Sequence, residues 1–371
     1  MRYVLVIILA VSMLLPSRNA AACAMFTIAN DNVVLMGNNE DYIKTGYIWF
    51  VPGTKKRYGR VNVGFSDKFA QGSMNEKGLS FDCASLPEVP YTPDPEKETP
   101  KNLLEKIMNE CATVDEAIGY FQRFNCSHLA GGQFMFADKS GASAVVTWDP
   151  ADRISIVRRD GPYQLITNER LEFSGYRSER FVLANRILAN AAEPSVDVAR
   201  DVLKRIHQRG EGAFTSYSTV YDLKAGTVHV YNLANFEEAV TIDLMAELAK
   251  GKHELPMEAL FEHSPTLASI RDDAPVKYET RIELPESQLQ RFAGDYVYES
   301  DGKELPMSIA IRDAGLVLSV EGQKEAVMHP ESETLFRFVK GGQASFELAT
   351  DGSVSAMVLH RNGDYRAPRV P

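Results

Sequence analysis

The sequence predicts an α+β fold in two parts, a large mixed domain over residues 23–250 and a small all-β, barrel-like domain over 284–371. In the first part the expected order is strands, helices, strands, helices, strands, which favours one layered domain over a βαβ repeat. In the second part, turn-forming residues recur about every 10 residues, which is typical of a small barrel or sandwich. Residues 251–283 are rich in Pro, His and charge without periodicity, and are predicted to be a linker.

Composition excludes several classes of function. The chain has 371 residues, of which 44% are hydrophobic and 24% charged, as expected for a globular protein with a full core. The net charge of −10 and the absence of a basic run argue against a nucleic-acid partner. We see no zinc-ligand spacing and no phosphate-binding glycine loop, so neither a metal nor a cofactor is expected.

Residues 1–22 carry the three parts of a signal peptide. A basic start at Arg2 leads into an apolar run from Tyr3 to Leu15, and three alanines end at Ala22. The apolar run is too short to span a bilayer, which needs about 20 residues. We therefore expect an exported protein, periplasmic or secreted, cleaved between Ala22 and Cys23 and without a transmembrane segment.

Within 23–250, apolar periodicity and turn or capping residues define the elements. The turn at Asn30–Asn32 indicates a first hairpin, and Thr113 followed by Asp115 and Glu116 opens a helix. Pro87–Pro100 contains five prolines and is predicted to be a surface loop that could act as a flap over a substrate. The expected elements are strands at 25–28, 33–36, 47–51, 61–65 and 79–84, helices at 102–110 and 114–124, strands at 133–137, 143–148, 153–158 and 163–167, helices at 178–190 and 195–209, and a hairpin of 216–223 with 227–232.

Cys23 would carry a thiol and a free α-amine on one residue once the leader is removed. An α-amine has a pKa near ~8, so it can take the thiol proton without a histidine. That pairing is an N-terminal nucleophile and points to amide-bond chemistry. A bacterial lipoprotein, in which such a cysteine is lipidated, is the alternative; the residue at −3 is Ala20 rather than a large aliphatic, but position 23 alone leaves both readings open.

The chain has only four cysteines, so its stability should come from the core. Cys111 and Cys126 flank a helix and could pair, although sequence does not fix connectivity. Cys83 is expected in a buried strand. Cys23 is then left free and exposed at a terminus.

Four further residues could complete a site, and each also has an ordinary interpretation. Asp41 ends a strand and could hold the α-amine, or belong to a hydrophilic turn. Asn75 lies in a tight turn, and Asn168 ends a strand from which its amide could donate. Arg180 lies on a helix, where an arginine is usually solvated.

Together these segments resemble the linear amide C–N hydrolases, the group that holds choloylglycine (bile salt) hydrolases and penicillin V acylases. The resemblance covers residues 23–245, and its most specific element is Met74–Leu79, which is similar to that family's Met-Asn-Glu-x-Gly-Leu. The segments that carry it, in order, are Cys23 behind a leader, Gly37–Tyr42, Met74–Leu79, Leu165–Asn168, Ser178–Phe181 and Ser216–Thr219.

The resemblance implies an αββα fold of the N-terminal nucleophile type and cleavage of a small-molecule N-acyl amide through an acyl-Cys23 intermediate. It implies that Asp41 holds the α-amine of Cys23. It also implies that Asn168 helps to form the oxyanion hole and that Arg180 orients the nucleophile or the substrate. Asn75, within the most specific motif, is expected near the substrate or oxyanion.

Two departures from the family pattern concern the same site. Asn38 stands where the family commonly has an arginine, which removes a cation from the thiolate. Ser85 stands where bile salt hydrolases carry a second oxyanion asparagine, and its hydroxyl can still donate one hydrogen bond. These changes favour a divergent branch with a different acyl substrate, and they leave a lipid-anchored or catalytically silent binding protein as alternatives.

The C-terminal part resembles a small β-domain appended to several exported bacterial hydrolases. The resemblance is carried by Gln290–Tyr296, by Leu335–Phe336 and by Ala344–Phe346. No catalytic residue is assigned to it.

Overall fold

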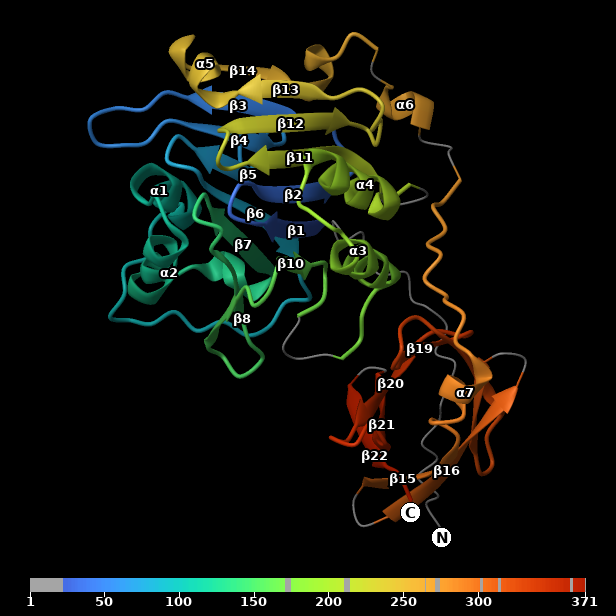
Figure 1. The fold of residues 1–371 in the computed structure, drawn as a ribbon. Helices are drawn as coiled ribbons and strands as arrows, with labels where there is room; N and C mark the ends of the chain where they lie inside the picture. Colours follow the sequence, from blue (N-terminus) through green and yellow to red (C-terminus); the bar gives the residue numbers. More distant parts are fainter. Residues whose placement is uncertain are drawn as a thin grey trace.

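The computed structural model describes residues 23–170, 175–209, 214–263, 265–270, 274–300, 303–312, 315–360 and 363–370. The predicted leader, 1–22, lies outside the described residues. The described chain forms three antiparallel sheets, with helices beside the first two (Figure 1).

The first sheet has six strands in the order β10-β1-β2-β11-β12-β13. Its centre is the N-terminal hairpin, β1 with β2, flanked by the later strands β10 and β11. The strands are β1 (Ala24–Ala29), β2 (Val34–Asp41), β10 (Tyr163–Ile166), β11 (Thr215–Asp222), β12 (Thr227–Asn232) and β13 (Val240–Asp243).

The second sheet has eight strands in the order β14-β3-β4-β5-β6-β7-β8-β9. The strands are β3 (Tyr47–Val51), β4 (Arg60–Gly64), β5 (Ala70–Asn75), β6 (Leu79–Ser85), β7 (Gly132–Asp138), β8 (Ser143–Trp148), β9 (Ile154–Arg158) and β14 (His253–Pro256). The helices of this region are α1 (Leu103–Glu110), α2 (Val114–Arg123), η1 (Ser127–Ala130), α3 (Glu179–Ala189), α4 (Val196–Ile206), α5 (Leu244–Ala249), η2 (Met257–Leu260) and α6 (Leu267–Ile270).

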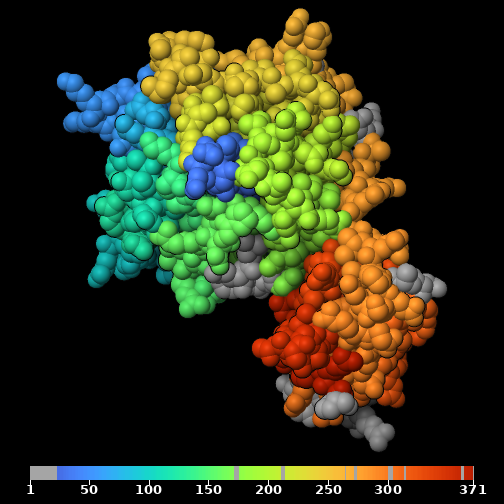
Figure 2. All heavy atoms as spheres, viewed as in Figure 1, coloured from blue at the N-terminus to red at the C-terminus, as the bar shows by residue number. Residues whose placement is uncertain are grey.

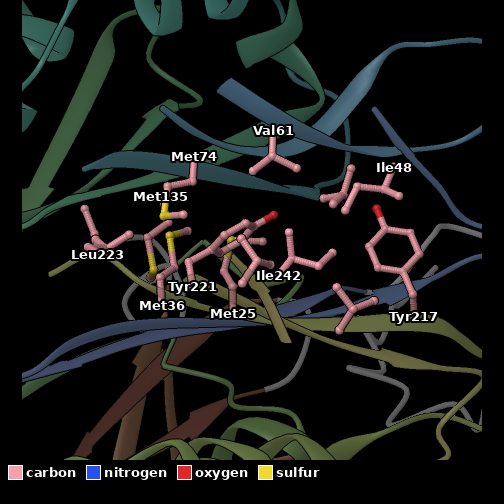
Figure 3. Packing of buried hydrophobic residues seen from close by; sticks show 14 of the residues in the cluster. Met25, Met36, Ile48, Val61, Met74, Met135, Tyr217, Tyr221, Leu223 and Ile242 are labelled. Carbon is pink, nitrogen blue, oxygen red and sulfur yellow. The ribbon is translucent and has the colours of Figure 1, made fainter. Parts of the chain in front are cut away.

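Three apolar cores follow from the alternation of side chains along these strands. The largest lies between the two sheets and takes Met25 and Met36 from the first and Val61, Met74 and Met135 from the second (Figure 3). A second core packs the other face of the second sheet against α1 and α2, and a third packs the other face of the first sheet against α3 and α4. Each sheet therefore presents one face to the other sheet and one face to helices.

The C-terminal sheet runs in sequence order from β15 to β22 and nearly closes on itself. Its ends meet where Val370 N donates to Asp295 O at 2.8 Å and Tyr296 bridges to Arg369. It encloses its own core and forms a distinct lobe (Figures 1 and 2). Its elements are α7 (Glu286–Leu289), β15 (Gly294–Ser300), β16 (Lys303–Arg312), β17 (Gly315–Val320), β18 (Ala326–Pro330), β19 (Leu335–Phe338), β20 (Gln343–Leu348), β21 (Val354–His360) and β22 (Asp364–Pro368).

Several elements were not predicted from the sequence, and two of them are strands of the second sheet. Strand β5 was not expected, because Gly72 and polar neighbours hide its alternation. The predicted linker contains an ordered strand, β14, which pairs with β3 because backbone hydrogen bonding at a sheet edge does not need an apolar sequence. Among the described residues, no helix has the length and apolarity needed to cross a membrane.

Candidate active site

Cys23 immediately precedes β1, and its side chain belongs to the core between the two sheets. It is only 2% exposed, which corrects the expectation of an exposed terminal thiol. The residue is covered because its side chain lies between the two sheets.

Strand register brings several predicted residues to the same end of the first sheet. Ala24 pairs with Asn39, so Glu40 on β2 lies one step beyond that pair, beside Cys23. Met25 pairs with Ile166, so Asn168 follows β10 at the same end. On the far side of β2, Glu40 pairs with Tyr217 of β11.

Asp41 and Arg180 form a buried ion pair on the helix-facing side of this end. The Arg180 Nη2 atom lies 2.8 Å from Asp41 Oδ2, and the two side chains are 7% and 0% exposed. Arg180 also donates from Nε to Ile206 O at 2.8 Å, which ties α3 to the end of α4. Arg180 is therefore not the solvated helix arginine that its sequence context alone would suggest.

Burial raises the pKa of the Asp41 carboxyl to about 6, although Arg180 and a hydrogen bond from Thr215 lower it. The backbone N–H of Asp41 donates toward Cys23 and lowers the pKa of the thiol. Asp41 thus approaches Cys23 through its backbone, while its carboxylate is held by Arg180.

Asn168 and Ser85 also lie together. The Asn168 Nδ2 atom donates to the Ser85 carbonyl oxygen at 2.8 Å. Ser85 ends β6, so this contact links the two sheets at the end where Cys23 lies.

Asn38 and Glu40 alternate along β2 with Met36, so their side chains face the space between the sheets with Cys23. Both are almost completely buried, at 0% and 1% exposure. Burial raises the pKa of Glu40 to about 8, and the nearby Cys23 thiol and Asn38 side chain lower it.

The Cys23 thiol is held in its protonated form. Burial raises its pKa well above the ordinary value, and the charges of Glu40 and Asp41 raise it further. A thiol in this setting becomes a nucleophile only when a base accepts its proton during the attack.

Asn75 does not belong to this site. Asn75 lies at the turn before β6, whereas Ser85 is the last residue of β6. The six steps along the strand from Leu79 to Ser85 span about 20 Å, so the two residues lie at opposite ends of β6. Its Nδ2 atom donates to Met108 O at 3.1 Å and Cys111 O at 2.9 Å, and its Oδ1 accepts from the backbone of Lys77 and Leu79. The structure therefore places Asn75 in a turn that supports α1, away from Cys23.

The possible Cys111–Cys126 disulfide is also absent. All four cysteines are free thiols, and Cys111 and Cys126 are buried separately in the core beneath α1 and α2. Flanking one helix in sequence does not bring two side chains to bonding distance.

Sequence reasoning missed several buried polar residues around Cys23, one on the facing sheet and three on its own sheet. Asp82 of β6 is fully buried, and so are Tyr217, Thr219 and Tyr221 of β11. The two tyrosines rise from the first sheet toward the second (Figure 3). The alternation Met36, Asn38, Glu40 could have placed Glu40 on this face, but the facing strand is set by tertiary packing.

No protein-family model matches the chain, and no curated protein matches it. Several solved structures are similar to it. A conjugated bile acid hydrolase from Clostridium perfringens, in a variant with one cysteine replaced by alanine, is 16% identical with a TM-score of 0.51, covering 64% of this chain and 96% of that chain. A second variant of that enzyme, with an arginine replaced by leucine, is 17% identical over 63% of this chain and 96% of that chain, with a TM-score of 0.51.

Penicillin V acylase from Agrobacterium tumefaciens is 21% identical with a TM-score of 0.51, covering 69% of this chain and 99% of that chain. The predicted resemblance to the choloylglycine hydrolase and penicillin V acylase group is therefore confirmed at the level of the fold.

Proposed function

We propose that this protein is an exported cysteine amidohydrolase that cleaves a linear, non-peptide amide bond of an N-acylated small molecule. The observation that carries the proposal is the place of Cys23, which lies buried at the start of the central strand of a fold shared with a bile acid hydrolase and a penicillin V acylase. We infer that the packed sheets and helices form the αββα arrangement over 23–250, followed by the β-domain over 284–371.

The proposed reaction proceeds through an acyl-enzyme. Removal of the leader frees the α-amine of Cys23, and the thiol attacks the substrate carbonyl as its proton is taken up. The tetrahedral oxyanion forms at the end of the sheet where Asn168 and Ser85 lie, and their polar groups would stabilise it. Asp41, held by Arg180, fixes the strand end against which the nucleophile sits.

Burial of Cys23 favours the enzyme over the lipid-anchored alternative. A lipidated cysteine must leave the protein to reach a membrane, whereas this side chain packs between two sheets. A mature N-terminus found by mass spectrometry to be lipidated would support the anchor and overturn the enzyme.

The test uses the mature protein and its Cys23→Ala and Cys23→Ser variants. We expect the wild type to hydrolyse at least one member of a panel of N-acyl amino acids, bile acid conjugates, penicillin V and acyl-homoserine lactones. Both variants should lose turnover by at least about 100-fold while still binding substrate, because removing an activated nucleophile removes the covalent route. Cys83→Ala, which removes a partly buried thiol from the other face of β6, is the control and should keep activity. Equal turnover in wild type and Cys23→Ala would exclude the mechanism.

A further inference from the structure

A row of three side chains crosses the first sheet at the position of Cys23. Cys23 precedes β1, Glu40 lies beside it on β2, and Tyr217 pairs with Glu40 from β11. Residues directly opposite on neighbouring strands share one face of a sheet, so this row looks into the space between the sheets. All three residues are at most 2% exposed.

Glu40 is an unusual residue for this position. A fully buried carboxyl on a central strand costs free energy unless its oxygens are satisfied. The Cys23 thiol and the Asn38 amide contact the carboxyl, but Glu40 Oε2 has no hydrogen-bond partner and is fully buried. An aliphatic side chain would fill the same space at lower cost, which indicates a role beyond packing.

The groups that interact electrostatically with Glu40 are acids. They come from each element packed against it, and their negative forms disfavour a second charge. These groups are Cys23 before β1, Asp41 on β2, Asp82 and Cys83 on β6, and Tyr217 and Tyr221 on β11. No cation is among the groups that shift the pKa of Glu40, and Arg180 is paired with Asp41 on the opposite face.

The thiol and the carboxyl therefore share protons as a pair. When the pair carries one negative charge, that charge rests mainly on Glu40, because the thiol has the higher pKa. A carboxylate that lies beside the attacking thiol is placed as a general base.

We propose that the Glu40 carboxylate is a second proton acceptor for the Cys23 thiol, acting beside the α-amine. This inference rests on the proposed function for the identity of the substrate. The proton transfer from Cys23 to Glu40 does not depend on that function. In the family pattern, an arginine at the position of Asn38 would place a cation near the thiol. In this chain, Glu40 on the same strand places a base there instead.

In the proposed reaction, Glu40 carries one proton between sulfur and the substrate in each half-reaction. The thiol proton passes to a Glu40 oxygen as sulfur bonds to the carbonyl carbon, and it then passes to the amide nitrogen as the C–N bond breaks and the amine leaves. Water next attacks the thioester and gives one proton to Glu40. That proton returns to sulfur as the C–S bond breaks and the carboxylic acid is released.

The experiment measures alkylation of Cys23 by iodoacetamide between pH 6 and 10, with the modified residue located by peptide mass mapping. Two forms of the protein are compared, one beginning at Cys23 and one that keeps Ala22 and so lacks the α-amine on Cys23. We expect the rate to rise in a step near pH 8 in both forms, where the shared pair loses its first proton.

Glu40→Gln should abolish that step in the form that keeps Ala22, where Cys23 has no α-amine, and should leave only the α-amine's contribution in the form that begins at Cys23; kcat/KM for amide hydrolysis should fall by about 100-fold or more with little change in KM. Asp82→Asn is the matched control, since it removes the facing carboxyl but leaves the one beside the thiol; the step should remain near the same pH, because the Glu40 charge raises the pKa of Asp82 and Glu40 ionises first. If Glu40→Gln does not fold, Glu40→Met removes the same acceptor with a side chain of similar length.

A step that survives in the Glu40 variants that keep Ala22, or that occurs only when the α-amine is free, would overturn the inference. A Glu40-dependent step in a protein that hydrolyses no amide would support the proton acceptor and count against the proposed function. The two proposals can thus fail separately.

Discussion

Asp41 and Arg180 form an ion pair that is almost completely removed from water. Each charge loses its hydration on folding, and the pair is tolerated only because the geometry is close and Arg180 also reaches a backbone carbonyl. Removing one partner leaves the other charge buried and uncompensated. The pair therefore links the position of α3 to the end of β2, where Cys23 lies.

We expect Arg180→Met to lower the free energy of unfolding by about 3–5 kcal/mol, because it leaves the Asp41 carboxylate without its cation. Arg200→Met is the control, since Arg200 pairs with the exposed Asp197 on α4 and should cost about 0–1 kcal/mol. Denaturant titration at pH 8 measures both. At pH 5, below the pKa of about 6, Asp41 is neutral in the folded protein, so the cost of Arg180→Met should shrink. Equal costs for the two variants would contradict the buried pair.

Single residues were predicted from sequence where a motif and a strand end coincide. Cys23, Asp41, Asn168 and Arg180 were chosen in this way, and the structure brings all four to one end of the first sheet or the helix beside it. Their partners could not be predicted, because the pairing of Asp41 with Arg180 depends on how α3 packs. Glu40 was overlooked because a charged residue after a strand normally indicates a turn.

At the scale of elements, the turn from β5 to β6 shows how a recognisable motif can serve the fold. Gly78 has φ +82°, a backbone conformation that favours glycine, and Asn75 accepts two backbone N–H groups of the same turn. The Asn75 amide then satisfies two carbonyls at the end of α1. The motif therefore joins a hairpin to a helix.

Asn75→Ala should lower the free energy of unfolding by at least about 1–3 kcal/mol, because it leaves buried backbone groups without partners. The folded fraction should keep its kcat/KM, since the turn lies far from Cys23. Lys77→Ala in the exposed part of the same turn should change stability by no more than about 0.5 kcal/mol. Thermal unfolding and a single-substrate assay decide the matter; a large loss of kcat/KM in folded Asn75→Ala would return this residue to the site.

Elements with strong local signals were the ones predicted well. The capping box at Thr113 and Glu116 is present, and the first hairpin forms as expected. Strands β5 and β14 were missed because neither carries apolar alternation. Both strands are stabilised by pairing with neighbouring strands, and a short stretch of sequence does not show which strands will pair.

At the scale of the whole molecule, the C-terminal sheet contacts the segment that leads into α3. Gln343 accepts from Arg177 N at 2.7 Å, and Arg337 donates to Arg177 O at 2.9 Å. Arg177 directly precedes Ser178, the N-cap of α3, and α3 carries Arg180. The C-terminal sheet thus supports the helix that holds Asp41, which gives this lobe a structural connection to the candidate site.

Glu331 hydrogen-bonds to both residues of the C-terminal sheet that contact Arg177. Its side chain is 1% exposed, and it accepts from Arg337 Nε and from Gln343 Nε2, both at 2.6 Å. Glu331→Gln would remove the charge from both hydrogen bonds, and loss of a hydrogen bond to a charged group costs about 1.5–3 kcal/mol. The two parts should then separate about 10- to 100-fold more often, since each 1.4 kcal/mol is about tenfold in an equilibrium constant.

Limited trypsin digestion measures this separation, because cleavage at Arg177 requires the contact to open. Glu331→Gln should be cleaved there faster by about the same factor, and its kcat should fall as Arg180 loses its fixed position. Glu347→Gln, which weakens the exposed pair with Arg366 in the same sheet, should be cleaved at the wild-type rate. Faster cleavage without any loss of kcat would separate the two effects, and would show that α3 keeps Arg180 in place without help from the C-terminal sheet.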